Sequence, residues 1–330
     1  MKYIDLGRTG MKVSRLCLGT MNFGPYTEEK EAFRIMDKAL DAGINFFDTA
    51  NVYGGTGHKG WTEEIIGRWF AQGGNRREKV ILATKVFGDM EDVNDGPNSR
   101  WGLSAYKIRR HIEDSLKRLK TDHIELYQMH HIERNMTWEE TWGVFENLVD
   151  KGKAFYIGSS NFAGWHLAQA QAAAAKRNFL GLVSEQHKYN LLCRLPELEV
   201  LPAAQGLGIG VIPWSPLAGG LLGRNIHSTE KGARSEQRLA TISLKEHAQL
   251  EEYSKICDEI IEAKDGEATV ALAWLLANPA ITAPIIGPRT GEQLEESLAA
   301  IDVKLSEEIM HRLDNIFPGP GGVAPEAYSW

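Results

Sequence analysis

The stretch "NFFDTANVYG", residues 45–54, joins a short apolar run to an acid and a phenol. Its first half is typical of the end of a buried β-strand, because the run carries no polar alternation. Asp48 stands where the apolar run stops, and Tyr53 follows in the next turn. Such a pair at the end of a buried strand indicates a polar site at the edge of a sheet.

The same alternation of an apolar strand and an amphipathic helix runs through the whole chain. Residues 1–15 are predicted to form a hairpin around "RTG". The predicted strands are 16–20, 44–49, 80–86, 124–130, 154–160, 181–186, 210–215 and 283–287. The predicted helices are 28–42, 61–72, 104–120, 137–151, 163–177, 196–205, 243–263, 267–277, 290–300 and 306–316.

Eight strand–helix units after a hairpin predict an α/β fold. Strands without polar alternation suit a sheet covered on both faces, and eight units in 330 residues are typical of a closed (β/α)8 TIM barrel. We expect a single domain over 1–330, with an N-terminal β-hairpin and additional C-terminal helices. An open doubly wound sheet is the alternative. The long connections 88–103 and 218–242 are either lids or surface insertions without a role.

Composition narrows the class of protein. The chain has 37 basic and 44 acidic residues and a net charge of −7, which disfavours nucleic acid or an anionic membrane as a partner. Cys17, Cys193 and Cys257 show no paired spacing, so we expect no disulfide framework and a reducing compartment. There is no secretory signal and no apolar run of membrane-spanning length, so a cytoplasmic protein is expected.

Polar side chains stand at the carboxyl ends of successive predicted strands, where such barrels carry their chemistry. In chain order they are Asp48, Tyr53, Lys85, His130, Ser160, Asn161, Gln186, Trp214, Ser215 and Arg289. Each alone has an ordinary structural interpretation, such as a helix cap or a core histidine. Chance explains an ordered series at consecutive strand ends poorly, so we interpret the residues as one site.

Asp48, Lys85 and Tyr53 together have the parts of a proton donor. A tyrosine, with a pKa near ~10, is a weak acid at neutral pH, and a nearby lysine cation is expected to lower that pKa. The lysine needs a carboxylate to offset its burial. With a histidine opposite that donates a hydrogen bond, the set predicts protonation of a carbonyl oxygen while its carbon is reduced.

The segments "FDTANVYG", "TKV", "LYQMH", "GSSNF" and "WSPLAGG" resemble the aldo-keto reductase superfamily, and the resemblance covers nearly the whole chain. "WSPLAGG" and "GPRTGEQLEES" are most similar to its bacterial branch related to the potassium-channel β subunits. The resemblance implies a catalytic tetrad. Tyr53 would be the proton donor, Lys85 and Asp48 would tune it, and His130 would orient the substrate carbonyl.

The resemblance also implies NADPH (NADP⁺) extended across the barrel mouth. Its carboxamide would contact Ser160, Asn161 and Gln186, and Trp214 would stack on the nicotinamide. The phosphates and the adenosine would lie against Ser215, Pro216, Leu217, Gly219, Gly287, Arg289, Gln293 and Glu296. An arginine there suits a 2′-phosphate, which favours NADPH over NADH.

Two positions depart from the family pattern. Trp214 stands where many relatives have tyrosine, which preserves stacking. Ser297 stands where an asparagine often follows the acid, which weakens the assignment of the adenine site.

The substrate pocket is predicted from aromatic residues near the mouth. Because adjacent strand residues face opposite ways, only one of His130 and His131 points into the mouth. We choose His130, because it ends "LYQMH" as the catalytic histidine of the family does, and His131 is assigned to the substrate pocket. The other candidates are Phe23, Tyr26, Trp101, Tyr328 and Trp330. An aromatic rim favours an apolar or ring-bearing aldehyde or ketone. The keto group of a deoxysugar or another natural-product intermediate is the alternative, because the opening "LGTMNFGP" and the tail are similar to reductases of such pathways.

Several other functions are disfavoured. "GTGHKG", residues 55–60, has the spacing of a dinucleotide fingerprint but does not begin at the strand end, so we interpret it as a loop. No metal site is expected, because no clustered ligand spacing occurs, and no serine-hydrolase elbow or second carboxylate marks a hydrolase. An NADPH-binding redox-sensing subunit of a larger assembly is the rival. The chain begins at the hairpin, which favours the free enzyme; a homo-oligomer is left open.

Overall fold

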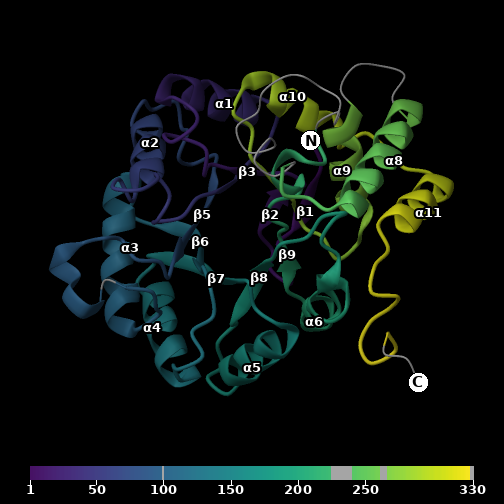
Figure 1. Cartoon of the computed structure of the whole chain (residues 1–330). Helices are drawn as coiled ribbons and strands as arrows, with labels where there is room; N and C mark the ends of the chain where they lie inside the picture. The colour runs from purple at the N-terminus through teal and green to yellow at the C-terminus, as the bar shows by residue number, and fades with distance from the viewer. Residues whose placement is uncertain (99, 224–239, 261–265, 328–330) are drawn as a thin grey trace.

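Eight parallel strands follow one another around a central axis, with helices outside them (Figure 1). The computed structural model describes residues 1–98, 100–223, 240–260 and 266–327. In chain order the parallel strands are β3 Cys17–Gly19, β4 Phe46–Asp48, β5 Ile81–Val86, β6 Ile124–Met129, β7 Ala154–Ser160, β8 Leu182–Gln186, β9 Gly210–Val211 and β10 Ile285–Ile286. The expected (β/α)8 barrel is confirmed.

The ring of strands closes between its last two members. The sheet order runs from β10 through β3 and then in sequence to β9. On the remaining side the amide of Thr282 donates to the carbonyl of Val211 at 2.8 Å, and the amide of Ile285 donates to that of Pro213 at 2.8 Å. These bonds exclude the open doubly wound sheet.

The helices lie on the outer side of the strands. They are α1 Glu29–Asp41, α2 Trp61–Phe70, α3 Ala105–Leu119, α4 Trp138–Asp150, α5 Gly164–Ala175, α6 Val200–Leu207, α8 Leu244–Ile260, α9 Gly266–Ala277, α10 Gly291–Ala299 and α11 Glu307–Ile316. Three short 3₁₀ turns, η1 Val93–Asn98, η2 Leu195–Glu197 and η3 Ala218–Gly220, lie in the connections. None of the described helices combines the length and apolar composition that crossing a membrane requires.

Most expected elements are confirmed to within a few residues, and the exceptions involve proline. The strand expected at 210–215 ends at Val211, because Pro213 has no N–H to donate to a neighbouring strand. The helix expected at 196–205 begins at Val200. Pro196 lies in the preceding 3₁₀ turn η2, and the backbone of Glu199 is not helical, with φ −144°. Of the connection 218–242, residues 224–239 lie outside the described residues.

Strand alternation separates two apolar clusters. Phe46 belongs to the smaller cluster inside the barrel, with Leu126 and Val183. Phe47, the next residue, belongs to the larger cluster between the strands and the helices. Because successive side chains point to opposite faces, Asp48 shares the direction of Phe46 and faces the barrel interior.

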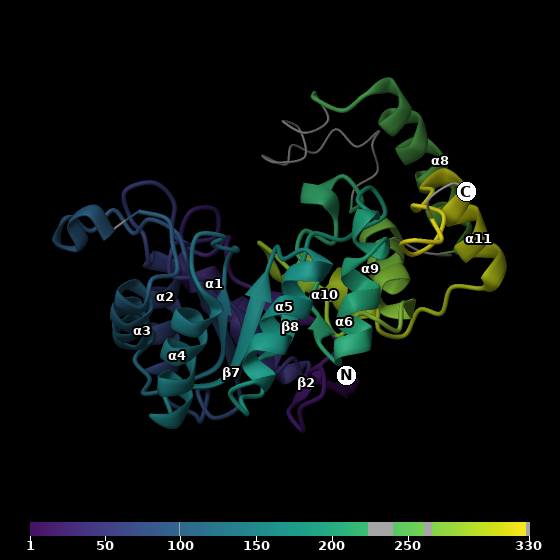
Figure 2. The same cartoon turned by 90° about the horizontal axis from the view of Figure 1, so that it is seen from below.

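The hairpin β1 Tyr3–Asp5 and β2 Lys12–Ser14 covers the amino-terminal end of the barrel (Figure 2). Gly7 lies in its turn with φ +56°, and a Cβ there would lie 2.4 Å from the carbonyl oxygen of Val183. The hairpin therefore closes the amino-terminal end of the barrel. The open mouth lies at the carboxyl ends of the strands, toward which β7 and β8 point in Figure 2.

Helix α3 connects the long segment after β5 to the sheet. The hydroxyl of Ser104 caps its first turn by accepting from the amide of Lys107 at 3.2 Å, and Lys120 ends it in a left-handed conformation. Its buried face includes the apolar residues Ile108 and Ile112 and three polar residues, Lys107, His111 and Ser115. The buried ring of His111 has two polar partners, Asn51 and Asp95.

Candidate active site

A buried ion pair joins strands β4 and β5 inside the barrel. Lys85 Nζ lies 2.6 Å from Asp48 Oδ2, and the two side chains are 0% and 4% exposed. The same ammonium donates to the backbone carbonyl of Thr49 at 2.8 Å and to the hydroxyl of Tyr53 at 3.2 Å. The three residues predicted to form a proton donor are therefore in direct contact.

The second carboxylate oxygen of Asp48 is also satisfied. Gln128 Nε2 donates to Asp48 Oδ1 at 3.0 Å, and Gln186 Nε2 donates to the same oxygen at 2.8 Å. Sequence reasoning missed Gln128. The available signal was a buried polar residue within the apolar strand β6, in register with Lys85. Both glutamines hold the carboxylate in one orientation beneath Lys85.

Tyr53 lies in the turn between β4 and α2. Its backbone amide donates to the carbonyl of Ala50 at 3.1 Å, and its carbonyl accepts from Gly60 at 3.0 Å. Lys85 Nζ lies 4.9 Å from the centre of the phenol ring, and the ring of His130 meets it edge-on at 6.0 Å. The four residues of the predicted tetrad thus gather at the mouth.

The pKa of Tyr53 differs in direction from the expectation. Burial raises it, and the charge and hydrogen bond of Lys85 lower it, but the net direction is upward from 10.0. The expectation of a lowered pKa was wrong, because it considered the charge of Lys85 but not the burial of the phenol, which raises the pKa. Tyr53 therefore carries its proton at neutral pH.

Lys85 and His130 differ in charge: Lys85 is protonated and His130 is neutral. Burial lowers the pKa of Lys85, but the charges of Asp48 and Tyr53 and their hydrogen bonds outweigh it, so the pKa is raised. Burial, with the nearby charges of Lys85 and His131, lowers the pKa of His130 to about 3. Lys85 is thus a cation and His130 a neutral ring at physiological pH.

The loops after β7, β8 and β9 adjoin this group. Asn161 adopts φ +61°, and its Nδ2 donates to the carbonyl of His130 at 3.2 Å and to the hydroxyl of Ser160 at 3.0 Å. Its Oδ1 accepts from Trp214 Nε1 at 3.1 Å. Of the residues expected to meet the carboxamide, Ser160 and Asn161 are joined, whereas Gln186 is turned to Asp48. Trp214, which was expected to stack on the nicotinamide, is bonded to Asn161.

The expected phosphate and adenosine residues follow β9 and β10. The backbone of Ser215 is left-handed, with φ +56°, and is held by Asn190 Nδ2 at 2.8 Å from its carbonyl. Pro216, Leu217 and Gly219 continue this loop into η3. Gly287, Arg289 and Gln293 follow β10, where the amide of Arg289 donates to Gln293 Oε1 at 2.9 Å. Glu296 lies one turn further along α10.

Two observations bear on whether this rim suits a dinucleotide. Arg289 is half-buried, and its guanidinium forms no ion pair with any residue that the structure describes. Asn22 donates to the carbonyl of Gly287 at 2.8 Å, while its buried Oδ1 has no hydrogen-bond partner among the described residues. A guanidinium without an ion pair and a buried acceptor without a hydrogen bond, both judged among the described residues, suit a phosphorylated, hydrogen-bonding ligand.

Three aromatic rings, those of Phe87, Trp101 and His131, gather in the segments that follow β5 and β6. The ring of Phe87 lies 5.8 Å from that of Trp101 and 5.5 Å from that of His131. Trp101 is 72% exposed and Tyr26 is 53% exposed. Phe87, which directly follows β5, was not predicted, although its position next to Lys85 was a usable signal.

One predicted pocket residue, Phe23, is not part of this group. Phe23 is fully buried in the larger apolar cluster, because its side chain turns toward the helices, so its assignment to the pocket is withdrawn. Tyr328 and Trp330 lie outside the described residues.

Known proteins are similar in sequence to this chain over most of its length. The aldo/keto reductase family matches residues 15–317. The uncharacterized oxidoreductase YrpG of Bacillus subtilis is 63% identical over 330 residues, covering 100% of both chains. A putative aryl-alcohol dehydrogenase of Schizosaccharomyces pombe is 35% identical, covering 94% of each chain.

A further relative matches the branch expected from the sequence. A probable voltage-gated potassium channel subunit beta of Arabidopsis thaliana is 34% identical over 317 residues, covering 92% of each chain. The family match spans most of the chain, and the relatives are covered almost end to end. The chain therefore belongs to the aldo/keto reductase family.

Proposed function

We propose that this protein is an NADPH-dependent oxidoreductase that reduces an aldehyde or ketone to an alcohol, with Tyr53 as the proton donor. The observation that carries the proposal is the buried chain from Asp48 through Lys85 to the Tyr53 hydroxyl, with contacts of 2.6 and 3.2 Å. A fixed cation beside a protonated phenol is suited to charge that develops on a carbonyl oxygen.

The bound dinucleotide supplies the hydride that reduces the carbonyl carbon. Tyr53 gives its proton to the carbonyl oxygen, and the ammonium of Lys85 stabilises the phenolate that remains. Asp48 keeps Lys85 charged and in place. The neutral ring of His130 orients the carbonyl by a hydrogen bond, and Tyr53 regains its proton from solvent.

Ser160, Asn161 and Trp214 would hold the nicotinamide, and the loop from Ser215 to Gly219 would border the phosphates. Arg289 would pair with a 2′-phosphate, because a guanidinium with no ion pair to any described residue at this rim favours a dianionic ligand. Replacing Arg289 with Ala should weaken NADPH binding by roughly tenfold or more and NADH binding little. Titration by cofactor fluorescence measures both; an equal loss for the two cofactors would exclude phosphate pairing.

Ring-bearing carbonyl compounds are the favoured substrate class, and the keto group of a sugar or other natural-product intermediate is the alternative. Support comes from the rings of Phe87, Trp101 and His131 beside the mouth. The similarity to a putative aryl-alcohol dehydrogenase points the same way.

The rival function is a cofactor-binding, redox-sensing subunit, which the similarity to a probable channel subunit favours. NADPH oxidation measured across aromatic, aliphatic and sugar-derived carbonyl compounds separates the two functions. The proposal predicts turnover with at least one class and preference for rings. NADPH binding without turnover on any class would support the subunit instead.

A further inference from the structure

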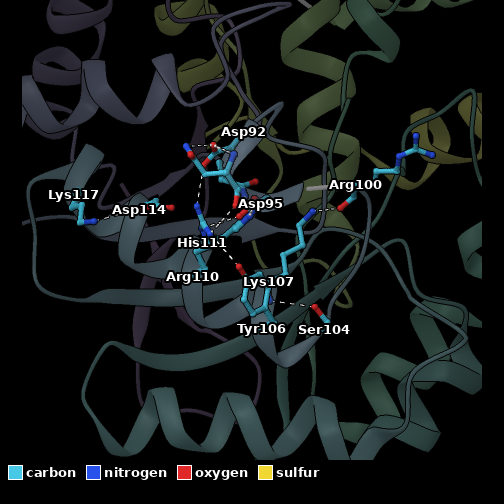
Figure 3. A network of polar contacts seen from close by, with 12 residues as sticks. Asp92, Asp95, Arg100, Ser104, Tyr106, Lys107, Arg110, His111, Asp114 and Lys117 are labelled. Atoms are coloured by element: carbon cyan, nitrogen blue, oxygen red, sulfur yellow. Dashed lines mark hydrogen bonds and ion pairs between the residues drawn. The ribbon is translucent and has the colours of Figure 1, made fainter. Parts of the chain in front are cut away.

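A second buried polar network lies beside the turn that carries Tyr53. Asn51 Nδ2 lies 3.1 Å from His111 Nδ1, and His111 Nε2 lies 2.9 Å from Asp95 Oδ2. The three residues are 0%, 3% and 4% exposed. They come from the β4–α2 turn, helix α3 and the 3₁₀ turn η1, so this Asn51–His111–Asp95 chain joins three separate segments. Figure 3 shows His111 and Asp95 of this chain with the polar residues around them.

The neutral imidazole satisfies both contacts. With its hydrogen on Nε2, His111 donates to the carboxylate of Asp95 and accepts at Nδ1 from the amide of Asn51. Burial lowers the pKa of His111, Asp95 opposes this change, and the charge of Lys107 lowers the pKa further, so the net direction is downward. The chain is therefore an ordered row of donors and acceptors.

The Asp95 end fixes the β5–α3 connection on helix α3. Arg110 Nε lies 2.7 Å from Asp95 Oδ1, and Arg110 also donates to the carbonyl of Asn94 at 3.4 Å. Lys107, which is buried, donates to the carbonyl of Arg100 (Figure 3). Trp101 follows directly. The polar contacts therefore hold the backbone directly before Trp101.

The Asn51 end fixes the turn that carries the proton donor. The amide of Asn51 donates to the carbonyl of Lys85 at 3.3 Å. The next residue, Val52, is so close to the connection that a Cβ on Gly88 would lie 2.4 Å from its Cγ1. An ion pair between Lys59 and Glu91, at 3.8 Å, joins the same two segments. The turn and the connection thus meet at several points.

We propose that Asn51, His111 and Asp95 are positioning residues, which hold the Trp101 connection in a fixed place relative to Tyr53 and thereby set the preference for ring-bearing carbonyl substrates. None of the three touches the tetrad through its side chain. The preference for rings rests on the proposed function; the mechanical coupling of the two segments does not.

The test compares His111→Phe with His111→Gln and with Asp114→Asn. Phenylalanine removes both hydrogen bonds, whereas glutamine retains one donor and one acceptor. Asp114 is half-buried on the same helix, with a side chain that is 37% exposed, and it pairs with Lys117 at 3.5 Å but forms no hydrogen bond with His111 among the described contacts. It is therefore the matched control for a change on α3.

Hydrogen exchange of the free protein, followed by mass spectrometry, tests the coupling without any substrate. In His111→Phe we expect faster exchange in both segments 49–60 and 88–103, with segment 154–160 unchanged. His111→Gln should restore most of the protection, and Asp114→Asn should match the parent. Faster exchange in 88–103 alone would overturn the coupling and leave only a local loop anchor.

Steady-state kinetics with benzaldehyde and propanal tests the selectivity. His111→Phe should raise the KM for benzaldehyde by roughly tenfold or more, because a small misplacement of a positioning group has large effects. The kcat for propanal and the dissociation constant of NADPH should stay within about twofold of the parent. Equal losses for both aldehydes would overturn the selectivity role. If the parent reduces neither aldehyde, the ring preference is overturned, hydrogen exchange alone decides the coupling, and the wider panel of carbonyl compounds decides the proposed function separately.

Discussion

Two buried polar networks flank the turn that carries Tyr53, and they are built from different kinds of element. The inner network, Asp48, Lys85, Gln128 and Gln186, comes from four strands of the barrel. The outer network, Asn51, His111 and Asp95, comes from a turn, a helix and a 3₁₀ segment.

The difference separates two tasks. Strand ladders fix the inner side chains relative to one another, so a charge can be held without water in one geometry. The outer network instead fixes loops, which no ladder holds. Chemistry therefore rests on the strands, and the shape of the substrate rim rests on side chains that tie the loops down.

The largest effect is expected from Lys85→Met in the inner network. This change leaves the carboxylate of Asp48 buried without its cation, which costs roughly 3–5 kcal/mol of folding free energy. It should also lower kcat by about 10²-fold or more, since the cation beside the phenol is lost. Urea unfolding and steady-state assays measure the two effects.

The control is Lys255→Met, because Lys255 pairs with Glu252 on the surface with a side chain that is 66% exposed. We expect no measurable change in its unfolding midpoint. If both lysine variants unfold at the parental midpoint, the buried Asp48–Lys85 pair does not contribute the expected folding free energy.

A smaller effect is expected from Gln128→Leu. Asp48 Oδ1 then keeps only the bond from Gln186, so the free energy of unfolding should fall by about 1–3 kcal/mol. Activity should fall less than in Lys85→Met, because the cation remains. Gln72→Leu, at an exposed position, is the control for the loss of an amide. Unchanged stability in Gln128→Leu would show that Gln186 alone holds the carboxylate.

The two networks also differ in what the sequence reveals. Asp48, Lys85 and His130 stand at ends of strongly apolar strands, so both the barrel and these residues could be predicted from strand pattern. Gln128 was missed because only the last residue of the predicted strand 124–130, His130, was interpreted as a site residue, although Gln128 lies in register with Lys85. His111 and Asp95 were missed because contacts between a helix face and a connection depend on tertiary packing, which no local period encodes.

The direction of the Tyr53 pKa was missed for a different reason. The sequence indicates which charges are near the phenol, but it does not indicate how completely water is removed. Burial is the leading cause of the upward direction, and it exceeds the opposing effect of Lys85.

The smallest effect is expected from pH within the physiological range. Tyr53 is protonated below its pKa, and that pKa is raised, so the proton for reduction is present through neutral pH and is lost only above the ordinary tyrosine value of about 10. His130, with a pKa of about 3, stays neutral over the same range. The profile of kcat for reduction should therefore be flat from about pH 6 to 9. A fall between pH 7 and 9 would mean that a different group, or a much more acidic phenol, supplies the proton.

The central claim is that the Tyr53 hydroxyl, held beside Lys85, protonates the carbonyl oxygen. Its most direct test is the single-turnover rate of NADPH oxidation, with enzyme in excess over aldehyde, for Tyr53→Phe and the parent. The account predicts a rate lower by about 10²- to 10⁴-fold, with the NADPH dissociation constant within about twofold of the parent. A Tyr53→Phe enzyme that reduces the aldehyde at the parental rate would contradict it.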